Sequence, residues 1–186
     1  MAASARLRAR DCIRYAKGVA MIELALLLPI LLVLALGVID FARAIQFNNV
    51  VTHLSREGAN LAARSSEQPQ HILKALMVTA EPLEMKTSGM MYVTRLIGRA
   101  DGSADVDAQY RPPQDIGKQE LASRVWAGCP PGGASCEMPT PRPVISLSVA
   151  LTDGEIVYAV ETFYDYMSLT RYVISSDPLL YSLTVL

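Results

Sequence analysis

The chain has 186 residues, of which 51% are hydrophobic and 19% are charged, and its formal net charge is −1. The basic residues are unevenly distributed, because the first 17 residues carry five of them against a single acid. This leader contributes about +4, so the rest of the chain carries about −5. That acidic balance excludes a nucleic-acid-binding protein, which would present a basic surface. The charged residues of the leader are Arg6, Arg8, Arg10, Asp11, Arg14 and Lys17.

An apolar segment follows the leader from Val19 to Ile39, and Glu23 is its one charged residue. At a rise of about 1.5 Å per residue, a helix here is about 31 Å long, which matches the hydrocarbon core of a bilayer. We therefore expect a transmembrane helix at 19–39, with the positive leader in the cytoplasm and the rest of the chain outside. A carboxylate inside such a span costs a few kcal/mol, so Glu23 is a candidate functional residue.

Two interpretations of this N-terminal segment do not depend on a resemblance to any known family. A secretory signal peptide would be cut after Ala42-Arg43-Ala44, but the apolar run of 21 residues exceeds the usual 7 to 15, and charged residues lie beside the site. An uncut signal anchor explains the length and the orientation, but it gives Glu23 no role.

A third interpretation rests on the spacing of three residues. Gly18 closes the basic leader, and four apolar residues separate it from Glu23. This arrangement resembles the class III signal of type IV prepilins. The resemblance implies that a membrane aspartyl protease, the prepilin peptidase, cuts between Gly18 and Val19 on the cytoplasmic side and leaves the helix as an anchor. Glycine suits such a site because it has no side chain to clash with the protease.

The same resemblance implies a role for Glu23. Cleavage creates an ammonium group on Val19, and the Glu23 carboxylate of a neighbouring subunit would neutralise it. Such a pair would lower the cost of both charges and fix the axial register of one helix against the next. The alternative is a carboxylate that snorkels to the cytoplasmic surface, because it lies only four residues past the cut.

A more specific resemblance covers both ends of the chain. Residues 22–29 (Ile-Glu-Leu-Ala-Leu-Leu-Leu-Pro), 37–43 and 55–59 (Ser-Arg-Glu-Gly-Ala), together with the closing Val157 to Tyr166, resemble the TadE-like minor pseudopilins of tight-adherence (Tad) pilus systems. Leu24, where the major pilins have Tyr, and a mature length of 168 residues favour a minor subunit. The resemblance implies a non-enzymatic protein without cofactors, whose partners are other minor and major pilins and the inner-membrane platform of the pilus.

The helical pattern continues beyond the membrane span. Apolar or small residues recur at steps of three and four, which predicts an amphipathic extension of the helix over 40–64. Pro29 removes one backbone hydrogen bond and is expected to kink or loosen the helix. The residues of this pattern are Phe41, Ile45, Val51, Leu54, Gly58, Leu61 and Ala62.

Residues 65–186 are expected to form one small α+β domain with a few antiparallel strands, outside the membrane. The pattern predicts a helix at 71–80, a strand at 90–97, a loop at 98–107 and a helix at 114–126. Strands at 144–151 and 156–166, joined by Asp153-Gly154, are expected to form a hairpin with one buried face.

Cys129 and Cys136 flank a turn-forming segment rich in Pro and Gly. We expect a disulfide between them in an oxidising periplasm. The alternatives are two free thiols in a mobile loop, or a zinc site, for which no second Cys or His pair is suitably spaced.

Motifs for catalysis are weak. His53 and His71 have no nucleophile motif nearby, and the acidic residues of 101–107 lack the Gly and Glu of a calcium-binding loop. The sequence therefore predicts a non-enzymatic, single-pass protein of the bacterial inner membrane with a periplasmic domain, without metal or cofactor. The alternatives are a signal-anchored periplasmic domain with an unrelated binding or catalytic role, and a pseudopilin of a type II secretion machine.

Overall fold

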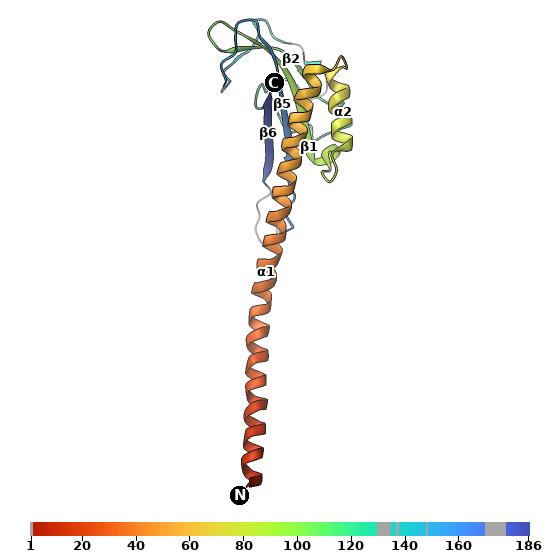
Figure 1. Cartoon of the computed structure of the whole chain (residues 1–186). Helices are drawn as coiled ribbons and strands as arrows, with labels where there is room; N and C mark the ends of the chain where they lie inside the picture. Colours follow the sequence, from red (N-terminus) through yellow and green to blue (C-terminus); the bar gives the residue numbers. More distant parts are fainter. Residues whose placement is uncertain (1, 130–134, 137, 148, 170–177) are drawn as a thin grey trace.

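A long helix followed by a small domain with an antiparallel sheet makes up the computed structural model, and the expected α+β fold is confirmed (Figure 1). The structure describes residues 2–129, 135–136, 138–147, 149–169 and 178–186, with side chains from residue 21 onward except that of Ser135. The elements are α1 (Ala2–Arg64), α2 (Pro69–Thr79), α3 (Met85–Ser88), β1 (Gly89–Gly98), β2 (Ala104–Tyr110), β3 (Ser135–Cys136), β4 (Val144–Ile145), β5 (Ile156–Asp165) and β6 (Leu179–Val185).

Helix α1 is unbroken over 63 residues, so the expected rod through 64 is confirmed. Pro29 lies inside it without ending it, in the apolar segment where a transmembrane helix tolerates proline better than a helix in water does. Its part from Met21 onward contains an 18-residue window of mean hydropathy 2.8, apolar enough to cross a membrane. The helix ends at Arg64, and Pro69 opens α2 at a position where its missing N–H is not needed.

The strands form one antiparallel sheet in the order β3-β2-β1-β5-β6, with β4 also paired to β2. The two central strands are β1 and β5, which pair from Gly89 opposite Tyr164 to Ile97 opposite Ile156. Both were expected from their β-branched and aromatic residues. Side chains of β1 are mostly buried on both faces, which is the pattern of a strand covered on each side.

The expected hairpin of 144–151 with 156–166 is wrong. Only Val144–Ile145 is a strand, and it pairs with β2, while β5 pairs with β1 and β6. The Asp153-Gly154 turn instead closes against the end of β1, where the Gly154 N–H donates to the Gly98 carbonyl at 2.9 Å.

Two further expectations about local structure are corrected. The observed loop after β1 is shorter than the expected loop 98–107, since β2 already begins at Ala104. Residues 114–126 form turns and irregular chain in place of a helix: Gly117 has φ +89°, and the N–H groups of Gly117 and Lys118 donate to the carbonyls of Lys86 and Gly89. The strand β6 was not expected at all.

The domain has three layers. On one face of the sheet, α1 and α2 cover Met91, Val93, Val160 and Tyr164. On the other face, residues from 121–129 and 138–147, here called the covering loop, pack over the remaining side chains of β1 and β5, including Tyr92 and those around Leu96. Because β-strand side chains alternate between faces, both layers draw on the same two central strands.

The buried stripe of α1 differs in part from the expected one. Asp40, Phe47, Val51, Leu54, Ser55, Gly58, Ala59 and Ala62 face the sheet and α2, whereas Phe41, Ile45 and Leu61 are exposed. The domain therefore contacts only the last part of the rod, and Figure 1 shows the N-terminal part projecting away from it.

Candidate functional site

The candidate functional site begins with a stem, Met21 to Ile39, that none of the described residues covers. Every residue from Met21 to Ile39 is exposed, which leaves a continuous apolar surface around the helix. The same surface continues beside the domain through Phe41, which is 69% exposed, and Ile45. Apolar surface on this scale is not stable in water and marks contact with lipid or with other proteins.

The expected processing and charge residues lie on this stem. Gly18 and Val19 lie within α1, just ahead of its described side chains. Glu23 is exposed, and its carboxylate has no hydrogen bond or ion pair with any side chain that the structure describes. At about 1.5 Å per residue, Glu23 lies roughly 26 Å from Asp40, where the domain begins to contact the helix.

Asp40 is the first buried residue of α1 among its described side chains, and it joins the stem to the end of β5. The Tyr166 hydroxyl donates to the Asp40 carboxylate and lies 3.1 Å from the Asp40 carbonyl oxygen. The Ser168 hydroxyl and the Leu169 N–H, the latter at 3.1 Å, donate to the same carboxylate. Burial, and then the hydrogen bond to Asp40, raise the pKa of Tyr166 to about 12. This group of donors compensates a buried charge and fixes the stem to the sheet.

Further contacts continue this junction along the helix. The ring of Phe47 packs edge-on against the rings of Tyr164 and Tyr166, with centroids 5.7 and 5.5 Å apart. About two turns after Phe47, the Ser55 hydroxyl donates to the Val160 carbonyl oxygen at 2.8 Å. The two segments that carry the family resemblance, at opposite ends of the chain, therefore pack directly against each other.

Gly58 allows the helix to approach the sheet closely. A Cβ atom at this position would lie 3.1 Å from Cγ1 of Val160 and 3.4 Å from Cδ1 of Leu76. Such contacts are tighter than ordinary packing, so the absence of a side chain brings α1, α2 and β5 together.

On the opposite face of the sheet, the buried carboxylate of Glu161 holds the covering loop. It accepts hydrogen bonds from the Ser123 hydroxyl, from the N–H of Arg124 at 2.9 Å and of Val125 at 3.2 Å, and from the Tyr181 hydroxyl at 3.0 Å. Burial and the charge of Glu161 raise the pKa of Tyr181. One carboxylate thus ties the loop to both β5 and β6.

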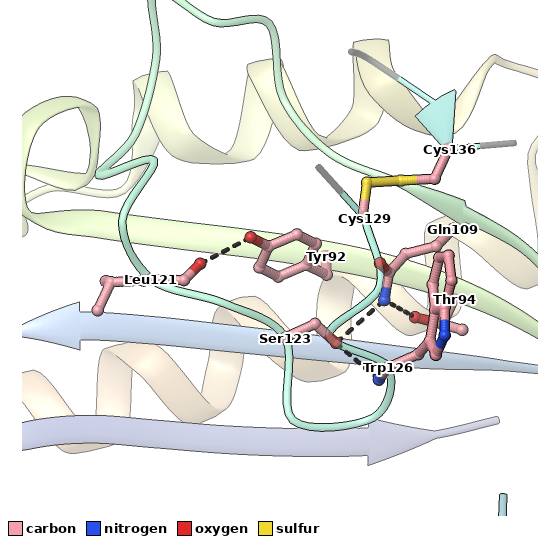
Figure 2. Close-up of a disulfide and its surroundings, with 8 residues drawn as sticks. All are labelled: Tyr92, Thr94, Gln109, Leu121, Ser123, Trp126, Cys129 and Cys136. Atoms are coloured by element: carbon pink, nitrogen blue, oxygen red, sulfur yellow. Dashed lines mark hydrogen bonds between the residues drawn. A yellow bond between two sulfur atoms is a disulfide. The ribbon is translucent and has the colours of Figure 1, made fainter. Parts of the chain in front are cut away.

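The two cysteines close this loop. A disulfide joins Cys129 to Cys136, whose Cα atoms are 5.4 Å apart, and Cys136 lies in β3 opposite Gln109 of β2. Figure 2 shows the same loop fastened to the sheet. The Tyr92 hydroxyl donates to the Leu121 carbonyl at 2.6 Å, and the Gln109 amide donates to the Ser123 hydroxyl at 3.0 Å. The disulfide therefore lies next to a segment that several hydrogen bonds hold against the sheet.

The acidic residues near the start of β2 form ion pairs. Arg99 contacts Asp105 at 2.9 Å, while Arg95 and Arg142 both contact Asp107. In the described part of the chain, no group of three or more His, Cys, Asp or Glu side chains is placed to hold a metal ion. The arginines therefore account for these carboxylates: Asp105 lies in a partly exposed pair, and the buried carboxylate of Asp107 is compensated by two arginines.

Sequence reasoning did not identify Asp40, Tyr166 or Glu161 as structural anchors. Each lay inside a segment quoted for the family resemblance, but their partners are far away in the chain, which no local pattern shows. A usable signal was present at Asp40, because an acid at the end of an apolar span and on the buried side of the helix needs donors.

Comparison with known proteins supports the N-terminal part of this description. Residues 18–60 match the model of the family described as TadE-like protein, which confirms the resemblance over that part of the chain. The match begins at Gly18 and covers the bare stem and most of the docked part of α1. No curated protein and no solved structure shows significant similarity to the chain.

Proposed function

We propose that this chain, whose residues 18–60 form a TadE-like domain, is a minor pseudopilin that takes part in the assembly or initiation of a Tad-type pilus. The observation that carries the proposal is the bare apolar stem from Met21 to Ile39, which leads from the start of the family match to a docked domain. A helix of this kind inserts in a bilayer before assembly and then packs against other helices of its own type.

In this proposal a prepilin peptidase removes residues 1–18 and exposes the amino group of Val19. The basic leader keeps the cut on the cytoplasmic side of the inner membrane, and the domain after residue 64 lies in the periplasm. The start of the family match at Gly18 supports this boundary, because the matched segment is the part that cleavage would leave behind, apart from Gly18 itself.

Glu23 then acts as the charge that selects the axial position of a neighbouring helix. Its side chain projects from the bare part of α1, where no other described side chain neutralises it. Pairing with the Val19 ammonium group of an adjacent pilin would remove two uncompensated charges from the hydrocarbon region. The expected consequence is a fixed stagger between subunits.

The domain contributes a rigid body at the outer end of the stem and no catalysis. The contacts of Asp40 with Tyr166 and of Ser55 with Val160 join helix and sheet, so a displacement of the stem would move the domain with it. Its partners in this proposal are other minor and major pilins and the inner-membrane platform.

Substitution of Glu23 tests this function. In cells that lack their own copy of the chain, Glu23→Ala should reduce the number of surface pili at least tenfold, while Glu23→Asp should restore part of it. Glu67→Ala, which removes an exposed carboxylate beyond α1, is the matched control and should leave pili unchanged. Pilus numbers are counted by electron microscopy, and the amount of each variant in the membrane is measured by immunoblot.

Either of two results would count against the proposal. Normal piliation without the chain would remove it from pilus assembly and would favour a signal-anchored domain with another task. Normal piliation with Glu23→Ala would leave a pilus role but exclude the charge-pairing mechanism.

A further inference from the structure

The outer edge of β6 is unprotected in the described part of the chain. β6 ends the sheet and pairs with β5 alone. It has seven residues and contains no charged residue, no Pro and no Gly. Native edge strands are usually blunted by charges, prolines, bulges or shortness, because an open edge invites a further strand. The opposite edge follows that rule, since it consists of the two-residue strands β3 and β4 along a β2 that carries Asp105 and Asp107.

The pairing of β6 with β5 decides which backbone groups face outward. Tyr158 and Leu186 exchange both backbone hydrogen bonds, at 2.8 and 3.1 Å. Hydrogen-bonded pairs alternate along an antiparallel ladder, so the even-numbered residues of β6 bond to β5. The N–H and C=O groups of Tyr181, Leu183 and Val185 therefore point to the open side.

A hollow lined by both apolar and polar groups lies beside this edge. The side chains of Tyr181, Leu183 and Val185 line it together with Ile145 and Leu147 from the covering loop. They lie on the face away from α1, because the side chain of the intervening Thr184 reaches Ser55 of α1. Every second side chain of a strand added to β6 would project over this hollow.

Arg124 places a positive charge at the hollow. The guanidinium of Arg124 lies 4.3 Å from the centroid of the Tyr181 ring and lines the hollow with it. The structure records no ion pair for Arg124 among the residues it describes. A carboxylate on the incoming strand would complement this charge. The β6 strand of a second copy has no such carboxylate, so charge favours a different chain.

We propose that the open edge of β6 binds a β-strand of another protein, with alternate apolar side chains over the hollow and one carboxylate beside Arg124. The inference goes beyond the proposed function, because it follows from the edge and the hollow and would hold for an anchored domain of any kind.

A synthetic peptide tests this edge. The probe is acetyl-Thr-Val-Thr-Glu-Thr-Val-Thr-amide with a fluorescent label, whose Val and Glu side chains share one face of a strand. It is titrated against the full chain in detergent micelles by fluorescence anisotropy. We expect saturable binding that weakens at least tenfold when the peptide Glu is replaced by Lys. A peptide N-methylated at every residue, which has no N–H group to donate to β6, should not bind.

Protein variants locate the binding. Leu183→Lys should weaken binding at least tenfold, because it places a charge on the edge. Val78→Lys on α2 is the matched control, since Val78 and Leu183 are similarly exposed, at 44% and 40%. Arg124→Gln should bring the affinities of the Glu and Lys peptides to within twofold of each other. Thermal unfolding of each variant verifies that the fold is retained.

Hydrogen exchange, measured by NMR, gives an independent measure. Bound peptide should slow exchange of the N–H groups of Tyr181, Leu183 and Val185 at least tenfold. The proposal is overturned if no peptide binds, or if binding is insensitive to Leu183→Lys. It is also overturned if the full chain forms dimers that Leu183→Lys abolishes, because the occupant would then be a second copy.

Discussion

The substitution Tyr166→Phe tests the junction between α1 and the sheet. The Tyr166 hydroxyl donates to the buried carboxylate of Asp40, and its ring packs edge-on against Phe47. Phenylalanine keeps the ring contact and loses only the hydrogen bond. Ser168 and Leu169 still donate to Asp40, so the carboxylate keeps two of its donors.

The expected loss follows from the charge of the acceptor. A hydrogen bond to a charged group contributes about 1.5–3 kcal/mol to stability, so Tyr166→Phe should lower the free energy of unfolding by about 2 kcal/mol. For a chain of this size, that corresponds to a fall of about 4–8 °C in Tm. Tyr158→Phe on β5 is the matched control, because no side-chain hydrogen bond is recorded for its half-buried ring among the described residues, and it should cost less than about 0.5 kcal/mol.

Urea unfolding of the full chain in a mild detergent measures both variants. Trp126, the one tryptophan, packs against the sheet in the covering loop and reports unfolding of the domain by its fluorescence. Equal losses for Tyr166→Phe and Tyr158→Phe would refute the assignment of Asp40 and Tyr166 as the anchor of the stem.

Four further outcomes are expected. Because burial raises the pKa of Tyr166 to about 12, the unfolded chain loses this proton first, and Tyr166 alone should lower stability by about 1.4 kcal/mol per pH unit between pH 10 and 12. Tyr166→Phe should reduce the slope of stability against pH in urea titrations, and an unchanged slope would contradict this expectation. Glu161→Ala should cost about 3 kcal/mol or more by urea unfolding, because it removes the acceptor from two partly buried N–H groups and two hydroxyls; a loss below about 1 kcal/mol would refute this role. Gly58→Leu should lower stability by about 1–3 kcal/mol through overpacking, and a Tm equal to that of the native chain would show that the helix can move away. Replacing Cys129 and Cys136 by Ser should cost about 2.5 kcal/mol under oxidising conditions, judged from a loop with a sequence separation of 7, and no change in Tm would show that the bridge does not constrain the chain.

The elements that sequence predicted well carry their own local signal. The apolar run and the three- and four-residue steps predicted α1 from Val19 to Arg64, though not its first part from Ala2, and runs of β-branched and aromatic residues predicted β1 and β5. The close spacing of Cys129 and Cys136 likewise suggested the bridge that the structure contains.

The elements that sequence missed depend on distant partners. Val144 to Leu151 alternates like a strand, yet only Val144–Ile145 finds a partner, because β5 is already paired on both sides. The apolar residues of 114–126 have helical spacing. Backbone N–H groups of this segment instead donate hydrogen bonds to the Glu161 carboxylate and to the carbonyls of Lys86 and Gly89. At the candidate site, the stem and Glu23 could be recognised from sequence, whereas the junction at Asp40 required the fold.

The mature N-terminus tests the central claim most directly. The full chain is expressed in bacteria with and without a prepilin peptidase, and its intact mass and N-terminal peptide are determined by mass spectrometry. The account predicts that the peptidase removes residues 1–18 and leaves Val19 as the first residue, and that Gly18→Leu blocks this cut. An intact leader in the presence of an active peptidase, or a cut after Ala44, would contradict the account.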